Sequence, residues 1–274
     1  MATAAAQLAQ PTTRLQLVER FKRKKVCGEV WHGDAVQFLR SIPEESADIV
    51  FLDPPFNLGK QYDAKHPKAD SRPDVEYEVW LKTVLKESIR VTKTGGAVYI
   101  YHLPLWAMRI GATLDGPLMF RHWIAVAMKN GFVRGDRLYP AHYALLLFTK
   151  GKPNHLRRPK LKPQACRHCG EYIKDYGGYK QIIDQNGINL SDFWEDLSPV
   201  RHSNTKHRAA NELPLRLFER VVEISGISGG LLVDPFAGSG AGLVAASTNK
   251  MTFKACDIVR ENCNIMCERL AALH

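Results

Sequence analysis

The motif Asp-Pro-Pro-Phe-Asn at residues 53–57 combines groups that could orient an amino group. Asp53 supplies a carboxylate acceptor, and the carbonyl of Pro54 supplies a second one that Pro55 holds in an extended conformation. Two acceptors on the N–H bonds of an exocyclic amino group would oppose delocalisation of its lone pair into the ring. Phe56 offers a ring face for stacking a flipped-out base. The motif therefore predicts chemistry on a planar, amino-bearing base, and a purely structural Pro-Pro turn is the alternative.

A second motif, Asp-Pro-Phe-Ala-Gly-Ser-Gly at residues 234–240, is an acidic, glycine-rich turn. Its glycines would let the backbone approach a ligand, and the helix expected after it would supply free N–H groups. The third glycine of the dinucleotide fingerprint is missing, and the acidic residue favours a cationic or hydroxyl-bearing ligand over a pyrophosphate. Asp257 ends the next expected strand and suits hydrogen bonding to ribose hydroxyls. The candidate cofactor residues are Asp234, Pro235, Phe236, Gly238, Ser239, Gly240 and Asp257.

Short apolar runs place both motifs at the carboxyl ends of strands, where open α/β sheets bind their ligands. Strands are expected at residues 26–32, 47–52, 97–101, 122–128, 143–148, 231–233 and 252–256. Helical spacing is found around residues 36–39 and at 77–91, 216–224, 241–247 and 262–270, and Gly95 with Gly96 is expected to end the second helical unit. This alternation predicts an α/β fold with a mostly parallel sheet and helices on both faces.

The charge of the chain favours a polyanionic partner. Its 274 residues carry a formal net charge of +10, which favours nucleic acid over a membrane surface, although a generally basic enzyme is the alternative. Residues 150–182 hold nine Lys or Arg and two acidic residues, so we expect phosphate contacts there rather than a merely solvated loop. The candidate nucleic-acid contacts are Lys150, Lys152, Arg157, Arg158, Lys160, Lys162 and Arg167.

Other features indicate a cytoplasmic protein without a membrane partner. Residues 1–13 lack the basic start and apolar core of a signal peptide, and residues 1–25 are expected to be a flexible lead-in. The six cysteines are expected to be reduced thiols. Cys166 and Cys169 have the spacing of half a zinc knuckle, which needs four ligands. A structural zinc completed by histidines such as His155, His202 or His207 is one interpretation, and two unliganded thiols is the other.

Both motifs resemble those of the amino-group DNA methyltransferases that use S-adenosylmethionine. The catalytic pattern of that family, Asp-Pro-Pro followed by an aromatic residue, is matched by residues 53–56, and its cofactor pattern Asp-Pro-Phe-x-Gly-Ser-Gly by residues 234–240. The catalytic motif comes first, as in the beta permutation class, and the resemblance extends over about residues 26–270. It implies a circularly permuted, Rossmann-like methyltransferase fold with a small recognition insert.

The resemblance also assigns segments outside the two motifs. Asp34 resembles the acidic strand end that contacts the adenine of the cofactor. Lys206 and His207 resemble a segment that contacts its methionine part, although Arg208 stands where the family more often has proline. The chain is thereby divided into a lead-in (1–25), a catalytic half (26–149), a basic target-recognition insert (150–200) and a cofactor-binding half (201–274) of the same domain.

The implied activity is transfer of a methyl group from S-adenosylmethionine to the N6 amino group of a flipped-out adenine in double-stranded DNA. Aspartate at the first motif position favours adenine, whereas serine is commoner in cytosine-N4 enzymes. Cytosine-N4 transfer is therefore the alternative, followed by an RNA-directed amino methyltransferase and an inactive nucleic-acid binder. The mechanism requires no metal. A homodimer and a cognate restriction endonuclease are the further partners that the resemblance suggests.

Overall fold

The computed structural model describes residues 13–23, 26–58, 72–128, 136, 138–197 and 212–273. Its strands are β1 (Gln16–Arg23), β2 (Val26–His32), β3 (Ala47–Leu52), β4 (Thr92–His102), β5 (Met119–Ala127), β6 (His142–Thr149), β7 (Lys160–Leu161), β8 (Ile188–Asn189), β9 (Phe193–Trp194), β10 (Leu231–Asp234) and β11 (Thr252–Asp257). Its helices are α1 (Ala35–Ser41), α2 (Asp74–Val91), α3 (Pro104–Leu114), the 3₁₀ turn η1 (Gly177–Tyr179), α4 (Lys180–Asn186), α5 (Leu215–Ser225), α6 (Ala241–Thr248) and α7 (Arg260–Ala272). None of these described helices is long and apolar enough to cross a membrane.

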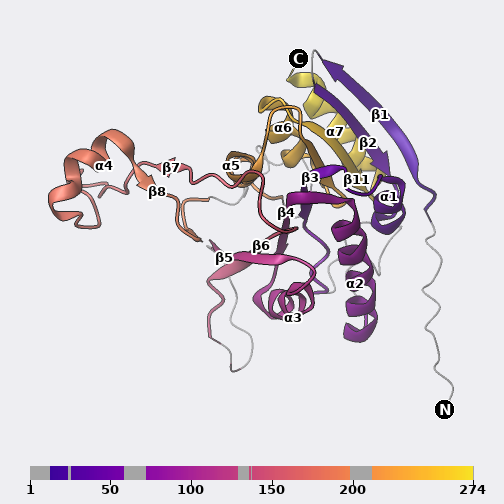
Figure 1. Ribbon diagram of the computed structural model, residues 1–274, viewed down its shortest axis with the longest axis horizontal. Helices are drawn as coiled ribbons and strands as arrows, with labels where there is room; N and C mark the ends of the chain where they lie inside the picture. The colour runs from indigo at the N-terminus through magenta and orange to yellow at the C-terminus, as the bar shows by residue number, and fades with distance from the viewer. Residues whose placement is uncertain are drawn as a thin grey trace.

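One nine-stranded sheet organises the molecule, in the order β1-β2-β11-β10-β3-β4-β6-β5-β9 (Figure 1). The five strands from β2 to β4 are mutually parallel, whereas β1 at one side and β6 and β5 at the other pair antiparallel with their neighbours. The strands β11 and β10, from residues 231–257, therefore lie between β2 and β3 in a single sheet. The expected α/β fold with a mostly parallel sheet is confirmed.

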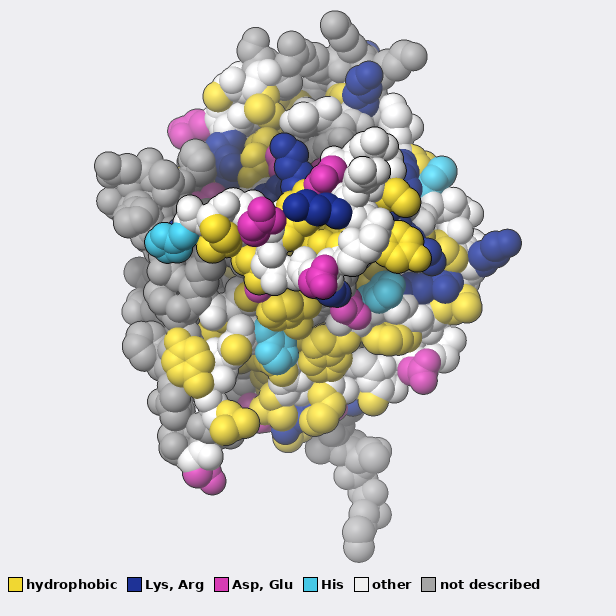
Figure 2. Space-filling view, turned by 90° about the vertical axis from the view of Figure 1, so that its left-hand side faces the viewer, with side chains coloured by type: hydrophobic (Ala, Val, Ile, Leu, Met, Phe, Trp, Pro, Cys, Tyr) yellow, Lys and Arg dark blue, Asp and Glu magenta, His cyan; other side chains and the backbone are white. Residues whose placement is uncertain are grey.

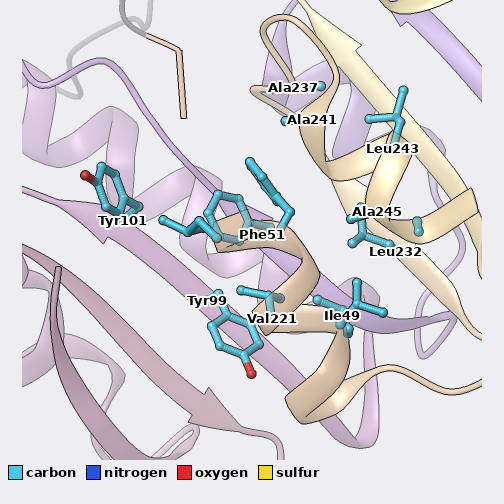
Figure 3. Close-up of a cluster of buried hydrophobic side chains, with 14 of the residues drawn as sticks. Ile49, Phe51, Tyr99, Tyr101, Val221, Leu232, Ala237, Ala241, Leu243 and Ala245 are labelled. Atoms are coloured by element: carbon cyan, nitrogen blue, oxygen red, sulfur yellow. The ribbon is translucent and has the colours of Figure 1, made fainter. Parts of the chain in front are cut away.

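Helices cover both faces of the sheet, and the side chains of β3 alternate between the two. Ile49 and Phe51 pack in a cluster with α5, α6 and α7, whereas Val50 and Leu52 pack with α1, α2 and α3. Figure 3 shows the first cluster, in which Val221 of α5 lies over β3. All four β3 side chains are fully buried, and each such burial stabilises the fold by roughly 1.5–3 kcal/mol. This two-sided burial explains the uninterrupted apolar run that predicted a parallel strand.

Strand β1 lies within the segment that the sequence predicted to be a flexible lead-in, and for Gln16–Arg23 the structure differs. β1 pairs antiparallel with β2, and its register shifts between Leu17 and Glu19. Phe21 packs against Phe253 of β11 with ring centroids 6.3 Å apart. The strand escaped detection because it is an edge strand rich in charged residues, and the register shift interrupts its alternating pattern.

The Gly95–Gly96 pair was expected to end a helical unit, and this expectation is wrong. Helix α2 already ends at Val91, and β4 begins at the next residue. Gly95 adopts a φ of +80°, where a Cβ atom would lie 2.4 Å from the Cγ of Asn154. The two glycines therefore mark an irregular beginning of β4, whose register against β3 shifts at this end of the strand.

Residues 160–189 form an arm that projects from the body of the molecule, as Figure 1 shows for β7, α4 and β8. The arm has its own two-stranded sheet, in which β7 pairs antiparallel with β8. The chain returns to the main sheet through β9, which pairs parallel with β5. Trp194 of β9 is buried, whereas the neighbouring Phe193 is exposed.

A buried arginine holds this returning segment against α5. The Arg220 side chain is fully buried, and its Nη1 and Nη2 donate to the two carboxylate oxygens of Asp196 at 3.0 and 2.6 Å. Its guanidinium group also lies 4.9 Å from the centroid of the Trp194 ring. The Arg220 side chain therefore joins the segment that returns from the arm to the body of the protein.

We expect Asp196→Ala to lower the free energy of unfolding by about 2 kcal/mol, because it leaves the Arg220 guanidinium buried without its carboxylate partner. The estimate is at the low end for a buried pair since the Asp196 side chain is itself 45% exposed. Urea unfolding measures the change. Asp192→Ala is the control, because Asp192 is an exposed aspartate in the same segment. Equal unfolding midpoints for the two variants would contradict this account.

Candidate active site

Four acidic residues lie along one edge of the sheet. Asp234 and Asp257 end β10 and β11, Asp53 follows β3, and Asp34 follows β2. These strands are parallel and adjacent, in the order β2-β11-β10-β3. The structure therefore brings the two sequence motifs together, with the first placed beside the second.

The turn at residues 234–240 is fixed from within and from the neighbouring strand. Asp234 is almost fully buried, and its Oδ1 accepts a hydrogen bond from the amide of Phe236 at 3.0 Å. The φ angles of Gly238 and Gly240 are +54° and +80°, a region that disfavours other residues. A Cβ atom on Gly240 would lie 2.8 Å from the Cγ of Met266 in α7. Glycine at position 240 is therefore required by backbone geometry and by helix packing.

Asp257 supports the same turn through its carboxylate. Its Oδ2 accepts from the amide of Gly238 at 2.9 Å, and its Oδ1 accepts from the amide of Val259 at 2.8 Å and from Asn262 Nδ2 at 3.0 Å. The side chain is buried. The sequence predicted a contact with ribose hydroxyls, which stays a prediction. The described hydrogen bonds give Asp257 an additional role in positioning Gly238.

Ser239 belongs to a buried polar cluster that the sequence did not reveal. Its hydroxyl donates to Glu212 Oε1 at 2.7 Å, and Arg269 Nη1 donates to the Ser239 carbonyl at 2.9 Å and to Glu212 Oε1 at 3.1 Å. Burial lowers the pKa of Arg269, and Glu212 opposes that shift. The Ser239 side chain thus ties the turn to α7. No sequence signal pointed to Arg269.

The carboxylates at this edge concentrate negative charge. Burial raises the pKa of the Cys256 thiol, and Asp257, Asp34 and Asp234 raise it further, so all three carboxylates lie near that sulfur atom. Asp34 also caps α1, since its Oδ1 accepts from the amides of Val36 and Gln37 at 3.0 and 3.1 Å. Such a group of carboxylates suits a ligand that carries a positive charge and hydroxyl groups, as the second motif predicted.

An aromatic wall stands beside the turn. The rings of Phe236 and Trp80 of α2 meet edge to face with centroids 5.9 Å apart. The guanidinium carbon of Arg72 lies 4.6 Å from the centroid of the Trp80 ring. Burial lowers the pKa of Arg72 and nearby Asp34 opposes this, which places Arg72 near the cluster of carboxylates. Neither Trp80 nor Arg72 was identified from the sequence.

The first motif places Asp53 and Phe56 against two tyrosines. Burial and the negative charge of Asp53 raise the pKa of Tyr101 and of Tyr143. The Phe56 ring is buried, with its centroid 6.1 Å from that of Tyr101 and 5.6 Å from that of Tyr143. Stacking of a base on Phe56 stays a prediction, because neighbouring rings surround Phe56 in this structure.

His102 of β4 lies directly behind the first motif. Its imidazole stacks on the Phe56 ring at 5.1 Å with an interplanar angle of 28°. Its Nδ1 accepts from the Leu103 amide at 2.8 Å, and its Nε2 lies 2.7 Å from the Tyr77 hydroxyl. Burial lowers the pKa of His102 to about 3. The imidazole is therefore neutral at ordinary pH.

This pKa predicts a loss of stability in acid. The unfolded chain binds a proton at His102 below its ordinary pKa of about 6.5, whereas the folded protein does so only near pH 3. Between these values the stability of the protein should fall as the pH falls, by up to about 1.4 kcal/mol per pH unit from this residue. Urea unfolding of wild type and His102→Gln at pH 7 and pH 5 measures the effect. Equal pH dependence in both proteins would contradict the assignment.

Some of the basic residues that were predicted to contact nucleic acid bond to other groups of the protein. Lys150 Nζ donates to the carbonyls of Ile89 and Thr92 at 3.0 Å each and pairs with Glu45. These partners lie at the end of β4 opposite the acidic edge, and a phosphate contact by Lys150 stays a prediction. Arg157 is similarly engaged, since its Nη2 donates to the Gly226 carbonyl at 2.5 Å.

The other candidates are exposed, and most of them lie in or before the arm. They are Lys152, Arg158, Lys160, Lys162 and Arg167. Figure 2 shows the face that carries the arm, where Lys and Arg side chains stand beside Asp and Glu side chains and hydrophobic ones. Exposed Ile173, Tyr179 and Ile182 contribute to this hydrophobic surface. The arm therefore presents a mixed surface rather than a uniformly basic one.

Cys166 and Cys169 lie in a tight turn of the arm. The Gly170 amide donates to the Cys166 carbonyl at 2.9 Å, and hydrogen bonds from the backbone of Cys169 and His168 lower the pKa of the Cys166 thiol. Within the described ranges, no group of three or more His, Cys, Asp or Glu side chains could hold a metal ion. Lys206, His207 and His202 lie outside the residues that the structure describes.

Comparison with known proteins agrees with the two motifs. The sequence profile of the DNA methylase family matches residues 47–268. The type II methyltransferase M.BamHI of Bacillus amyloliquefaciens is 41% identical over 244 residues, which cover 89% of this chain and 57% of that protein. The chain thus spans less than two thirds of the length of this relative.

Solved structures share the fold. The PvuII cytosine-N4-specific DNA methyltransferase matches 88% of this chain and 86% of its own with a TM-score of 0.64 and 15% identity. The M1.HpyAVI complex with S-adenosylmethionine matches 89% of this chain and 98% of its own with a TM-score of 0.57 and 17% identity. These likenesses establish a Rossmann-like methyltransferase fold, whereas circular permutation stays a prediction from the order of the motifs.

Proposed function

Because this chain belongs to the DNA methylase family, we propose that it transfers the methyl group of S-adenosylmethionine to an exocyclic amino group of a base in DNA. One observation carries the proposal. Asp53 and Asp234 lie at the carboxyl ends of β3 and β10, which are adjacent parallel strands. Neighbouring strands are about 5 Å apart, so the turn that can orient an amino group stands beside the turn that can hold a nucleoside cofactor.

The residues of the first motif would act by positioning. The bound cofactor supplies an electrophilic methyl group on a sulfonium sulfur. The Asp53 carboxylate and the Pro54 carbonyl each accept an N–H of the amino group, which directs the nitrogen lone pair toward that methyl group. Burial and the nearby Asp53 raise the pKa values of Tyr101 and Tyr143, so both neighbouring phenols stay neutral. After transfer, the surplus proton leaves to Asp53 or to water.

The charge and shape of the second motif fit S-adenosylmethionine. Asp34, Asp234 and Asp257 surround Cys256, and their carboxylates complement the positive sulfonium and ammonium groups and the ribose hydroxyls. The partly buried Phe236 ring, which meets Trp80 edge to face, offers an apolar surface for the adenine. The remaining contacts of this proposal, by Lys206 and His207, rest on the family resemblance alone. The M1.HpyAVI structure, which contains S-adenosylmethionine, supports the choice of cofactor.

Double-stranded DNA is the proposed substrate, and residues 150–200 are the proposed recognition insert. The exposed Lys152, Arg158, Lys160 and Lys162 would contact phosphates, which fix register rather than read sequence. The type II methyltransferase M.BamHI is a relative of restriction-modification type, so a cognate restriction endonuclease belongs to the proposal. A homodimer is a further proposal, which sedimentation of the purified protein tests. The zinc interpretation gains no support from the described residues.

The identity of the base is tested by incubation with labelled S-adenosylmethionine and unmethylated genomic DNA, followed by nucleoside mass spectrometry. N6-methyladenine is the result that Asp53 predicts. N4-methylcytosine would keep the mechanism and replace the base. Label in stripped total RNA but not in DNA would move the activity to RNA. Cofactor binding without transfer to either polymer would indicate an inactive nucleic-acid binder.

A further inference from the structure

A chain of three hydrogen bonds runs behind the first motif. The Leu103 amide donates to His102 Nδ1 at 2.8 Å, so that nitrogen accepts and the imidazole hydrogen is on Nε2. Nε2 then donates to the Tyr77 hydroxyl at 2.7 Å, and this hydroxyl donates to the Pro55 carbonyl at 2.5 Å. Each donor in this series of three hydrogen bonds therefore faces an acceptor.

Burial of Tyr77 and His102 protects these three hydrogen bonds. Tyr77 and His102 are 1% and 0% exposed, so water does not compete for their hydrogen bonds. An imidazolium would carry hydrogen on both nitrogens and could not accept from Leu103. Because burial lowers the pKa of His102 to about 3, the neutral form that the chain requires persists through the ordinary pH range.

This series of hydrogen bonds attaches the first motif to elements other than β3. Asp53 is held by the strand that precedes it, and the pyrrolidine rings of Pro54 and Pro55 restrict the backbone between them. The Pro55 carbonyl is held by Tyr77, and the Phe56 ring lies on the His102 imidazole. The carboxyl-terminal part of the motif is thereby attached to two further elements, α2 and β4, while β3 holds its beginning.

We propose that Tyr77 and His102 are positioning residues for methyl transfer, which hold the Asp53 carboxylate and the Pro54 carbonyl where they meet the amino group. This inference rests on the proposed function. Neither residue is assigned to contact the base or the cofactor. Their effect would come through the orientation of the motif, since a displacement of about 1 Å in a reacting group can cost a hundredfold in rate.

Tyr77→Phe tests the proposal because it removes one hydroxyl and keeps the ring. We expect kcat on DNA to fall at least tenfold, while the dissociation constant of S-adenosylmethionine changes less than twofold. Tyr99→Phe is the matched control, since the Tyr99 hydroxyl is equally buried on β4 and bonds to Ser225 Oγ at 2.7 Å, away from the motif. If Tyr77→Phe and Tyr99→Phe retain the same kcat, the proposal is overturned.

A double-mutant cycle asks whether the two residues act through one chain. His102→Leu should lower kcat as Tyr77→Phe does, and the double variant should lose no more than the worse single variant. His102→Gln retains a donor toward Tyr77 and should keep more kcat than His102→Leu. Independent, multiplying losses in kcat would contradict a shared role.

The wild-type protein separates this inference from the proposed function. Methylation by wild type together with a tenfold lower kcat in Tyr77→Phe supports both. Methylation by wild type that Tyr77→Phe leaves unchanged overturns the positioning role alone. Absence of methylation by wild type, with S-adenosylmethionine bound, overturns both.

Discussion

Asp53→Ala is expected to reduce methyl transfer by roughly a hundred- to ten-thousandfold, the range found when a positioned acid-base group is removed. The variant loses the carboxylate that accepts an N–H of the target amino group, and the neighbouring Tyr101 and Tyr143 are neutral phenols, which are weaker acceptors than a carboxylate. Single-turnover transfer of labelled methyl groups to DNA measures the loss. The affinity for S-adenosylmethionine, measured by calorimetry, should stay within a fewfold of wild type.

Two further variants sharpen this test. Asp53→Asn keeps an acceptor oxygen and the side-chain shape, so it should retain more transfer than Asp53→Ala. Asp48→Asn changes an aspartate at the other end of β3, where the carboxylate binds Lys93 and the Leu231 amide at 2.8 Å each. This control should affect stability and leave transfer intact. Undiminished turnover in Asp53→Ala would remove Asp53 from the mechanism.

Asp257→Ala is expected to weaken binding of S-adenosylmethionine by about tenfold to a hundredfold. This carboxylate accepts from the amides of Gly238 and Val259 and from Asn262, and the loss of these bonds leaves the amide of Gly238 without its described acceptor. An unsatisfied buried amide costs about 1–3 kcal/mol, which the cofactor turn would recover only by moving. Such a cost corresponds to the expected range of affinity, since about 1.4 kcal/mol is a factor of ten.

Controls must separate a general loss of protein stability in Asp257→Ala from a local change in the turn at residues 234–240. Asp196→Ala serves as the control, because it removes a carboxylate from a buried arginine of α5 that has no described bond to the turn, and it should leave cofactor affinity unchanged. Asp257→Asn retains an acceptor for the Val259 amide and should bind more tightly than Asp257→Ala. Equal cofactor affinity in Asp257→Ala and wild type would show that the turn does not depend on this side chain.

The sequence predicted the central strands well because their apolar composition can be recognised within a few consecutive residues. Residues 49–52 and 231–233 are apolar on both faces, as strands buried between two layers of helices must be. The acidic residues that follow them could be placed at one edge of the sheet for the same reason. By contrast, the antiparallel direction of β5 and β6 depends on long-range pairing, which no local pattern reports.

The sequence predicted the two motifs of the candidate site but only some of the contacts that their residues make. The sequence could not show that Ser239 bonds to Glu212 or that Lys150 bonds to the carbonyls of α2 and β4, because these partners come from distant segments. The sequence around a lysine in a basic run is the same whether its side chain faces solvent or donates to the carbonyl groups at the end of a helix. Tyr77 and His102 were missed for a similar reason, since Tyr77 reads as one more apolar residue of an amphipathic helix.

The pairing of β3 with β10 has a consequence for synthesis of the chain. The Asp48 carboxylate on β3 and the Leu231 amide on β10 are bonded across 183 positions of sequence. While the ribosome is still making the segment between them, β3 has a partner in β4 but its other side is an open, apolar strand edge, which is a template for aggregation. The reactive site therefore comes into existence only after β10 has emerged and inserted into the middle of the sheet, so a truncated nascent chain is both inactive and vulnerable.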